Sequence, residues 1–344
     1  MTTLYVTHPR CADHDLPFHP EHAGRIRAVW KRIDESGLLG RVQALEAEPV
    51  DEAQILAVHD AEYLKALQFS AQQDRTLHLD SDTYINPESY EISRLSAGGV
   101  VIAANRVVTG AASNAFVVTR PPGHHAVRQR GMGFCLLSNV AIAAQAMIDT
   151  HQLERILIVD YDVHHGNGTE AIFYDRPDVM FISTHQYPLY PMTGAARDTG
   201  VGKGEGFTLN LPMPKNCGDQ RYLEVFEQVI IPAARRYRPQ LILVSAGYDA
   251  HWADPLAQMR LTLNGFAELG RRLKMLADEL CAGKIVFAME GGYYVEALAY
   301  GMVNVGHILL GEPTIDPLGE PDDILPEPPL ESLIKQVRQI HKLT

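Results

Sequence analysis

Cysteine and positive charge are both scarce in this chain of 344 residues. The four cysteines, Cys11, Cys135, Cys217 and Cys281, lie far apart and include no C-x-x-C pair. This spacing indicates neither a disulfide framework nor a zinc site built from paired thiolates. Lysine and arginine number 30 against 42 aspartates and glutamates, which gives a net charge of −12. That balance argues against binding to nucleic acid or to an anionic membrane surface. The excess of acidic residues is compatible with a cationic substrate, but a requirement for solubility explains it equally well.

Long hydrophobic runs are absent as well. No segment reaches 18 uninterrupted apolar residues, and residues 1–10 lack a basic stretch followed by an apolar run. We therefore expect no membrane span, no secretory signal, and a reducing, cytoplasmic location. Hydrophobic residues at 46% and charged residues at 21% are ordinary for a soluble globular protein. The composition leaves the oligomeric state open and is compatible with a homo-oligomer.

Short β-branched runs alternate with amphipathic stretches along the chain. The predicted strands cover Ala115 to Thr119, Ile156 to Asp160, Val179 to Ser183, Leu241 to Ser245 and Lys284 to Met289. Their apolar density indicates strands that are buried on both faces. The predicted helices cover Ser138 to Thr150, Gln220 to Tyr237 and Asn264 to Cys281. This alternation predicts an α/β fold in one domain, with a mostly parallel central sheet flanked by helices.

The end of the chain differs in composition from the rest. Residues 311–329 are rich in proline and acidic side chains, which predicts an extended strap over the surface. The segment from Glu331 to Leu343 carries Leu333, Val337 and Ile340 at helical spacing. We predict that residues 311–344 pack back onto a catalytic body formed by residues 1–310, in preference to binding a partner.

Polar side chains follow four of the five predicted strands. The segments are R-P-P-G-H-H at 120–125, D-Y-D-V-H-H-G-N-G at 160–168, A-G-Y-D at 246–249 and E-G-G-Y at 290–293. In parallel α/β sheets, ligands bind at the carboxyl ends of the strands. We therefore expect these four segments to meet at one edge of the sheet.

Two of these segments carry a candidate metal centre. Asp162 and His164 are two residues apart in extended chain, so their side chains point the same way. Asp249 adds a third ligand from another strand end and leaves a position open for water and substrate, as catalytic zinc requires. A zinc-bound water would have a pKa near ~7 and so supply hydroxide at neutral pH. A lone aspartate here is more often a helix cap, but the joint arrangement favours a metal, and the same donors accept iron.

Groups for proton transfer lie beside this centre. His124 and His125 follow two prolines and a glycine, which places two candidate bases on a stiff loop. Asp160 and Asn167 flank the metal ligands closely enough to orient these imidazoles. Tyr293 follows two glycines and could donate a hydrogen bond to a substrate carbonyl. Local sequence gives equal weight to an ordinary half-buried tyrosine.

In this order and spacing, the segments R-P-P-G-H-H, G-F-C, D-Y-D-V-H-H-G-N-G-T, S-A-G-Y-D-A and M-E-G-G-Y resemble the histone deacetylase family. The resemblance extends to H-P-E-H-A-G-R-I at 19–26, V-H-D-A-E-Y-L at 58–64 and S-D-T-Y at 81–84, and these pieces are nearer to class II than to class I. It covers about residues 4–310. It implies an arginase/deacetylase-like fold and a zinc-dependent hydrolase that acts on linear amides.

The resemblance also implies a role for each matching residue. Asp162, His164 and Asp249 would hold zinc, His125 would act as general base and acid, His124 would stabilise charge, and Tyr293 would polarise the carbonyl. A structural potassium ion would be bound by the Ser183 hydroxyl and by the main-chain carbonyls of Asp160, Asp162, His164 and Thr184. An acyl-lysine channel would be formed by Gly133, Phe134 and Tyr190, with Asp82 at its rim and Arg25 below its floor.

Several positions depart from parts of the family pattern. Asn167 stands where class I members have a carboxylate, so His125 should be a readier base at neutral pH. Cys11 and His19 match part of a second zinc site of some class II members, but Val100 stands where a further cysteine would be needed, and we predict no structural zinc. Leu256 occupies the position at which a polyamine-selective relative carries glutamate.

The expected substrate is therefore acetyl-lysine or a small acylated amine, with an acetylpolyamine amidohydrolase as the alternative. A ureohydrolase of the arginase type is less favoured because its second manganese needs a D-x-D motif, and His251 stands two residues after Asp249. A third reading is a non-enzymatic module that binds acyl-lysine or metal. The complete set of Tyr293, His124 and His125 argues against it.

Overall fold

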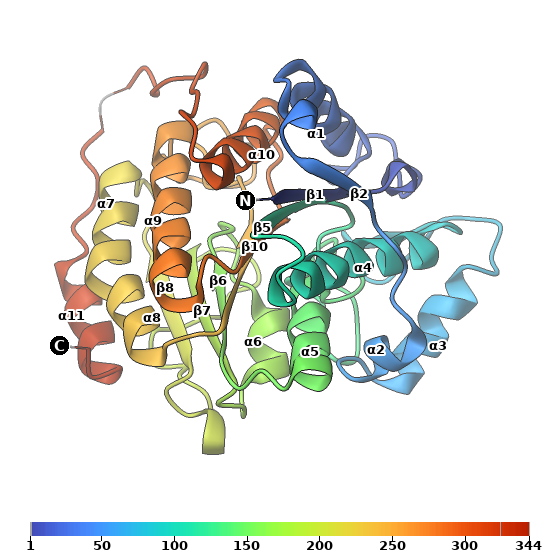
Figure 1. Cartoon of the computed structure of the whole chain (residues 1–344), viewed down its shortest axis with the longest axis horizontal. Helices are drawn as coiled ribbons and strands as arrows, with labels where there is room; N and C mark the ends of the chain where they lie inside the picture. Colours follow the sequence, from blue (N-terminus) through green and yellow to red (C-terminus); the bar gives the residue numbers. More distant parts are fainter. Residues whose placement is uncertain (1, 324, 344) are drawn as a thin grey trace.

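The computed structural model describes residues 2–323 and 325–343. Its centre is an eight-stranded sheet in the order β2-β1-β5-β10-β9-β6-β7-β8, in which every neighbouring pair is parallel (Figure 1). A separate antiparallel pair, β3 with β4, lies in the segment that follows α3. The strands are β1 Thr3–Thr7, β2 Gln43–Glu46, β3 Leu77–His78, β4 Tyr84–Ile85, β5 Asn114–Val118, β6 Ile156–Asp160, β7 Val179–Gln186, β8 Thr208–Met213, β9 Leu241–Ala246 and β10 Ile285–Met289.

Helices cover both faces of the sheet. They are α1 Gly24–Glu35, α2 Glu52–Leu56, α3 Ala61–Ser70, α4 Ser89–Val108, α5 Asn139–His151, α6 Asn167–Phe173, α7 Asp219–Val225, α8 Ile231–Tyr237, α9 Leu263–Cys281, α10 Val295–Leu310 and α11 Glu331–Ile340. Short 3-10 turns occur at Pro9–Ala12, Leu38–Gly40 and Gly202–Gly204.

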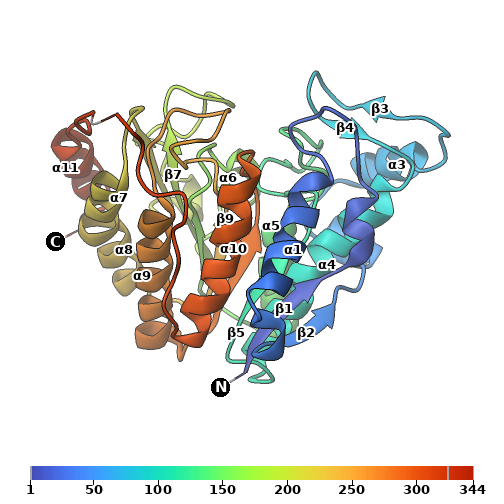
Figure 2. The same cartoon turned by 90° about the horizontal axis from the view of Figure 1, so that it is seen from above.

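The strands are apolar on both sides, and their side chains alternate between two cores. In β6, Ile156 and Ile158 belong to the core under α4, α5 and α6, whereas Leu157 and Val159 belong to the core under α1, α9 and α10. Helices α1 and α10 lie side by side over the second core, as both views show (Figures 1 and 2). This burial on both faces is what near-continuous apolar runs predict for a parallel sheet.

The five predicted strands are present as β5, β6, β7, β9 and β10, and the predicted mostly parallel α/β fold is confirmed. Strands β1, β2 and β8 lie outside the predicted set. So does helix α4, which contains two consecutive glycines. A Cβ on Gly98 would lie 1.7 Å from the carbonyl oxygen of Glu48, so the glycine is required by the close approach of the segment after β2.

The predicted helix from Gln220 to Tyr237 is present but irregular. It runs as α7 and α8 with one π-helical turn, Phe226–Ile230, between them. Pro232 explains the irregularity, because it has no N–H and its ring crowds the carbonyl four residues earlier. That carbonyl belongs to Gln228, and it accepts a hydrogen bond of 2.7 Å from Arg338 in α11.

The C-terminal helix packs on the body through a face that includes two of the three predicted residues. Ile334 and Val337 are buried in the core shared with β8, whereas Leu333 is half-buried and Ile340 is exposed. Leu330, just before the helix, is also buried. Of the predicted residues Leu333, Val337 and Ile340, the first two pack against the body and Ile340 does not, whereas Ile334, which the prediction omitted, is buried.

Described residues of the strap are tied to the body by hydrogen bonds. Trp252 donates to the carbonyl of Gly319 at 2.9 Å, and Asn304 donates to that of Ile315 at 2.8 Å. Among the helices of residues 2–323 and 325–343, none is long and apolar enough to cross a membrane.

Candidate active site

Four neighbouring strands end at the site. β5, β10, β9 and β6 are adjacent in the sheet and run the same way, so their carboxyl ends lie at one edge. His124 and His125 follow β5, Asp162 and His164 follow β6, Asp249 follows β9 and Tyr293 follows β10. The structure therefore brings the predicted segments together at the edge at which parallel sheets bind ligands.

Asp162, His164 and Asp249 form a compact cluster of buried ligand atoms. One atom from each lies within 4.8 Å of the others. His164 Nδ1 is 3.2 Å from Asp162 Oδ1 and 3.1 Å from Asp249 Oδ2. Ligands about 2.0–2.2 Å from a tetrahedral zinc are separated by little more than 3 Å. The spacing therefore suits three ligands of one such ion.

Backbone N–H groups fix both carboxylates. Asp249 Oδ1 accepts from Val163 at 2.8 Å, which leaves Oδ2 facing His164. Asp162 Oδ2 accepts from Gly291 at 2.8 Å. A Cβ on Gly291 would lie 2.2 Å from Asp249 Oδ2 and 2.5 Å from Asp162 Oδ2, so only glycine fits there. The cluster is held rigidly before any ligand binds.

The charges of the cluster call for a cation. Burial disfavours a charged imidazole, yet hydrogen bonds to Asp162 and Asp249 outweigh it and raise the pKa of His164 to about 10. Burial also raises the pKa of Asp249 to about 7. The two carboxylates thus favour a positive charge on His164, at the point where the three side chains converge. One imidazole and two carboxylates with a position left open are a donor set that catalytic zinc accepts.

His124 is held by the carboxylate that ends β6. Its Nδ1 is 3.0 Å from Asp160 Oδ2, and its Nε2 is 3.8 Å from Asp162 Oδ1. Burial opposes a charge on this ring, but the carboxylates of Asp162 and Asp160 outweigh burial and raise the pKa of His124 well above its usual value. His124 is thus the imidazole of the pair that is stabilised as a cation.

His125 has a neutral partner instead. Its Nδ1 is 2.7 Å from Asn167 Oδ1, and Asn167 Nδ2 donates to Met132 Sδ at 3.6 Å. Burial, together with the charges of His124 and His164, lowers the pKa of His125 well below its usual value. A neutral ring that donates from Nδ1 to an amide oxygen keeps its Nε2 lone pair free. The structure therefore prepares His125 to accept a proton at Nε2.

Tyr293 lies between Phe134 and Arg25 in the segment that follows β10. Its ring is 5.7 Å from that of Phe134, and the Arg25 guanidinium lies 4.9 Å from its ring centroid. Burial raises the pKa of Tyr293 well above its usual value, so the phenol keeps its proton at neutral pH and can donate it in a hydrogen bond. Gly292, with φ +123°, supplies the turn in front of it.

Of the predicted potassium ligands, Asp160 in β6 and Ser183 in β7 are paired in the register of the sheet, and Thr184 follows Ser183. His185 Nε2 is 2.9 Å from the Gly194 carbonyl and donates to it, because a carbonyl oxygen can only accept. Burial lowers the pKa of His185 well below its usual value, so the ring is neutral and carries one proton. Its Nδ1 therefore accepts from the Ser183 hydroxyl at 2.9 Å. The Ser183 hydroxyl donates its proton in this contact, so the lone pairs of its oxygen are not used in it.

Two predicted wall residues adopt an unusual backbone conformation. Gly133 and Phe134 both have positive φ, +54° and +68°. A Cβ on Gly133 would lie 2.4 Å from the His125 ring, so glycine is needed there. The Phe134 N–H donates to Thr83 Oγ1 at 3.1 Å, which helps to hold a conformation that a bulky residue rarely adopts.

Other predicted wall and rim residues also lie at this edge. The Tyr190 ring packs edge-on against His125 at 5.2 Å. The main-chain carbonyl of Asp82 lies 2.9 Å from His19 Nε2. Burial and the neighbouring Asp80 raise the pKa of the Asp82 carboxyl. Leu256 is half-buried in the loop after β9.

A buried ion network beneath Tyr293 is more extensive than the sequence indicated. Arg25, predicted below the floor, pairs with Glu21 at 3.0 Å and donates to the carbonyls of Gly292 at 2.8 Å and Glu290 at 2.6 Å. Arg120 binds the same Glu21 carboxylate through two bonds of 2.7 and 2.5 Å. Sequence reasoning missed Glu21 and Arg120. Both lay in quoted motifs, but their partners come from distant segments.

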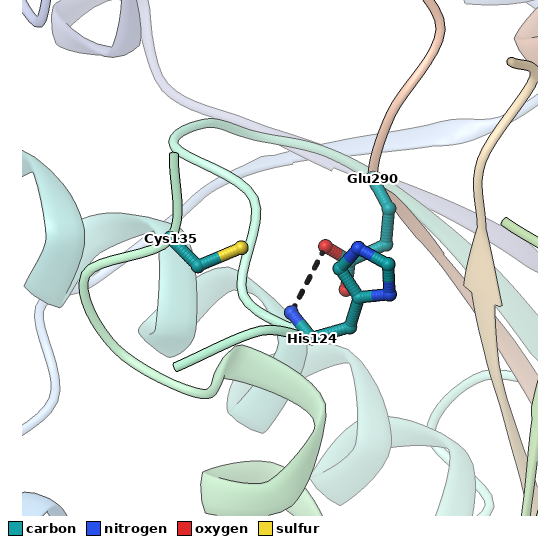
Figure 3. A group of neighbouring side chains, drawn as sticks. All are labelled: His124, Cys135 and Glu290. Carbon is teal, nitrogen blue, oxygen red and sulfur yellow. Dashed lines mark hydrogen bonds between the residues drawn. The ribbon is translucent and has the colours of Figure 1, made fainter. Parts of the chain in front are cut away.

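A second cluster of metal-type donors surrounds Glu290 (Figure 3). It contains His124, Cys135 and Glu290, all buried. Glu290 Oε2 accepts from the N–H groups of Gly123 at 2.7 Å and His124 at 3.3 Å, and burial raises its pKa to about 7. His124 Nδ1 is already engaged by Asp160. Glu290 thus anchors the histidine loop to the end of β10, a role that sequence reasoning missed.

These two clusters are the groups of three or more donors that could hold a metal among residues 2–323 and 325–343. Neither includes Cys11, His19 or His251. His251 is buried, and its Nδ1 accepts from the Ala253 N–H at 3.2 Å. The geometry gives no support to the dinuclear arrangement of a ureohydrolase.

Comparisons with known proteins agree with this geometry. The family model for the histone deacetylase domain matches residues 19–309. The chain is 39% identical over 331 residues to a probable deacetylase of Archaeoglobus fulgidus, covering 95% of this chain and 91% of that protein. It is 40% identical to a histone deacetylase-like amidohydrolase of Pseudomonas aeruginosa, covering 84% and 75%. The crystal structure of the HDA15 HD domain superposes with a TM-score of 0.90 at 33% identity, covering 99% and 96%.

Proposed function

The chain belongs to the histone deacetylase family of hydrolytic enzymes, and from this premise we propose that it hydrolyses N-acetyl amides with the help of one zinc ion. The observation that carries the proposal is the convergence of Asp162, His164 and Asp249 beside a neutral His125. Zinc bound there would act as a Lewis acid on the substrate carbonyl and would lower the pKa of a bound water. A potassium ion at Ser183 would be structural.

His125 performs the proton transfer in this proposal. Its free Nε2 removes a proton from the attacking water and later returns one to the leaving amine. Asn167 holds the ring through Nδ1 without adding a negative charge. His124, paired with Asp160, keeps positive charge near the developing oxyanion. We assign different roles to the two imidazoles because their pKa values are shifted in opposite directions: that of His124 is raised and that of His125 is lowered.

Tyr293 supplies the second polarising contact. Its neutral phenol donates to the carbonyl oxygen as negative charge grows on it. Donors that are positioned before the reaction stabilise the transition state more than the substrate. Arg25 and Glu290 contribute indirectly, by fixing the loop and the histidine segment that carry these groups.

The substrate is proposed to be acetyl-lysine or a small acetylated amine. The aromatic rings of Phe134 and Tyr190 flank the centre and suit an unbranched alkyl chain. Leu256 offers no carboxylate for the inner ammonium of a polyamine, so acetylpolyamines are the second candidate. The fold of the described residues and the net charge of −12 give no basis for nucleic acid binding.

A phenylalanine at position 293 tests the proposal. Tyr293→Phe removes only the hydroxyl, and we expect kcat on a fluorogenic acetyl-lysine amide to fall by ~10² to 10³, since loss of one oxyanion donor costs about that much. Zinc content should not change. Tyr294→Phe is the matched control, because it removes a neighbouring phenol hydroxyl and should keep wild-type turnover.

Three results would count against the proposal. Equal turnover of the two variants and the wild type would remove Tyr293 from the reaction. A zinc-loaded wild type that binds acetyl-lysine without cleaving it would favour a binding module. Cleavage of acetylpolyamines at a much higher kcat/KM than acetyl-lysine peptides would favour the second substrate class.

A further inference from the structure

The side chain of Asp254 forms hydrogen bonds within two loops of the site. Its Oδ2 accepts hydrogen bonds from the N–H groups of Tyr293 at 2.7 Å and Tyr294 at 3.0 Å. Its Oδ1 accepts from Leu256 at 2.9 Å. The side chain is almost fully buried, with 6% of the residue exposed. One carboxylate thus links the loop after β9 to the segment that carries the phenol.

The segment in front of Tyr293 has little support of its own. Gly291 and Gly292 have no side chains, and neither position tolerates one. A Cβ on Gly292 would crowd Tyr248 and Leu298 at 3.2 and 3.3 Å, in addition to the clash already described at Gly291. Glycine leaves the backbone with more accessible conformations than any other residue. The position of Tyr293 therefore depends on hydrogen bonds from outside the segment.

Those hydrogen bonds come from both sides. Arg25 holds the carbonyls of Glu290 and Gly292 on the amino side, and Asp254 holds the N–H groups of Tyr293 and Tyr294 on the carboxyl side. Helix α10 begins at Val295, and Tyr294 makes no side-chain cap for it. A carboxylate at this helix end is stabilised by the unpaired N–H groups and by the helix dipole.

Given the proposed function, we propose that Asp254 is a positioning residue that sets the place of the Tyr293 phenol. It acts through the backbone and does not touch the substrate. Hydrogen bonds to an ionised acceptor are roughly twice as strong as neutral ones. Because Oδ1 also accepts from the N–H of Leu256, the same side chain links the Tyr293 segment to the loop that follows β9. A displacement of the phenol by ~1 Å would be enough to cost ~10²-fold in rate.

A double-mutant cycle tests the inference in the full chain, with kcat on a fluorogenic acetyl-lysine amide as readout. Asp254→Ala should lower kcat by ~10- to 10²-fold with little change in KM or zinc content. In the Tyr293→Phe background the same substitution should change kcat by less than ~3-fold, because the group that it positions is already gone. Asp254→Asn keeps one oxygen acceptor and should recover part of the loss.

Asp219→Ala is the matched control. Asp219 is a largely buried carboxylate that accepts from the N–H of Thr262 at 2.8 Å and from its hydroxyl at 2.6 Å. It anchors the other end of the same loop, away from Tyr293. We expect this variant to lose stability without a selective loss of kcat. Equal kcat losses from Asp254→Ala in both backgrounds would indicate a general structural role and overturn the inference.

A second measurement does not depend on turnover. 3-Fluorotyrosine placed at position 293 alone should give one sharp ¹⁹F resonance in the zinc-loaded protein. Asp254→Ala should shift and broaden it, and Asp219→Ala should not. An unchanged resonance in Asp254→Ala would overturn the inference even if the chain proved inactive. If the wild type were active and Tyr293→Phe retained full activity, the proposed role of the phenol would be wrong.

Discussion

Alanine in place of Asp249 is expected to prevent zinc binding and to abolish turnover. In the proposed site Asp249 would supply one of three protein ligands, and its removal would leave only Asp162 and His164, too few to hold zinc at a catalytic site. Zinc measured by mass spectrometry after gel filtration should fall from about one ion per chain to near zero. The rate on an acetyl-lysine amide should fall with it.

The control separates metal loss from damage to the fold. Asp219→Ala also removes a largely buried carboxylate that accepts from a backbone N–H, and it should retain a full complement of zinc. A circular dichroism spectrum of Asp249→Ala that matches the wild type would show that the chain is folded. If Asp249→Ala kept both zinc and rate, the assignment of the metal ligands would be wrong.

Replacing His125 by alanine should give the second largest loss, with the metal retained. General acid–base catalysis by a positioned group is worth ~10² to 10⁴ in rate. His125 is not among the three converging ligands, and it is the imidazole whose pKa is lowered, so its loss should remove proton transfer and leave zinc binding unaltered. Single-turnover rates and zinc content on the same preparation measure the two effects separately.

Asn167→Asp gives an independent check on the same residue. The new carboxylate would face His125 Nδ1 and raise the pKa of the ring. A base with a raised pKa stays protonated to higher pH, so the acid limb of the kcat/KM profile should move to higher pH. A limb that did not move, together with a small loss in His125→Ala, would assign the base to another group.

The grouping of the candidate site residues could be predicted from the sequence because they are close to strand ends. Asp162 and His164 lie in one short segment, and a parallel sheet brings the ends of β5, β6, β9 and β10 to the same edge. Strand ends could be predicted from apolar runs that are buried on both faces. The resemblance to the histone deacetylase family then gave each residue a role.

The supporting residues could not be predicted in the same way. Glu21 meets Arg120 across 99 residues, and Asp254 meets Tyr293 across 39. Nothing in local spacing or periodicity indicates such pairs, since they depend on how loops fold over the sheet edge. Glu290 lies in the same motif as the predicted Tyr293, three residues before it, but its side chain holds Gly123 on another loop.

The remaining errors have equally local causes. The apolar face of α11 was predicted incompletely because spacing alone fits several sets of apolar residues, so the buried Ile334 was omitted and the exposed Ile340 was included. The π-helical turn before Pro232 depends on how the chain relieves a steric clash, which hydrophobic periodicity does not reveal.

Titration of the metal-free protein with zinc tests the central claim most directly. Acetate released from an acetyl-lysine peptide is measured after each addition. We predict that the rate rises from near zero and reaches its plateau at about one zinc per chain, as a single three-ligand site requires. A full rate in the absence of metal, or a plateau reached only at two ions per chain, would contradict the account.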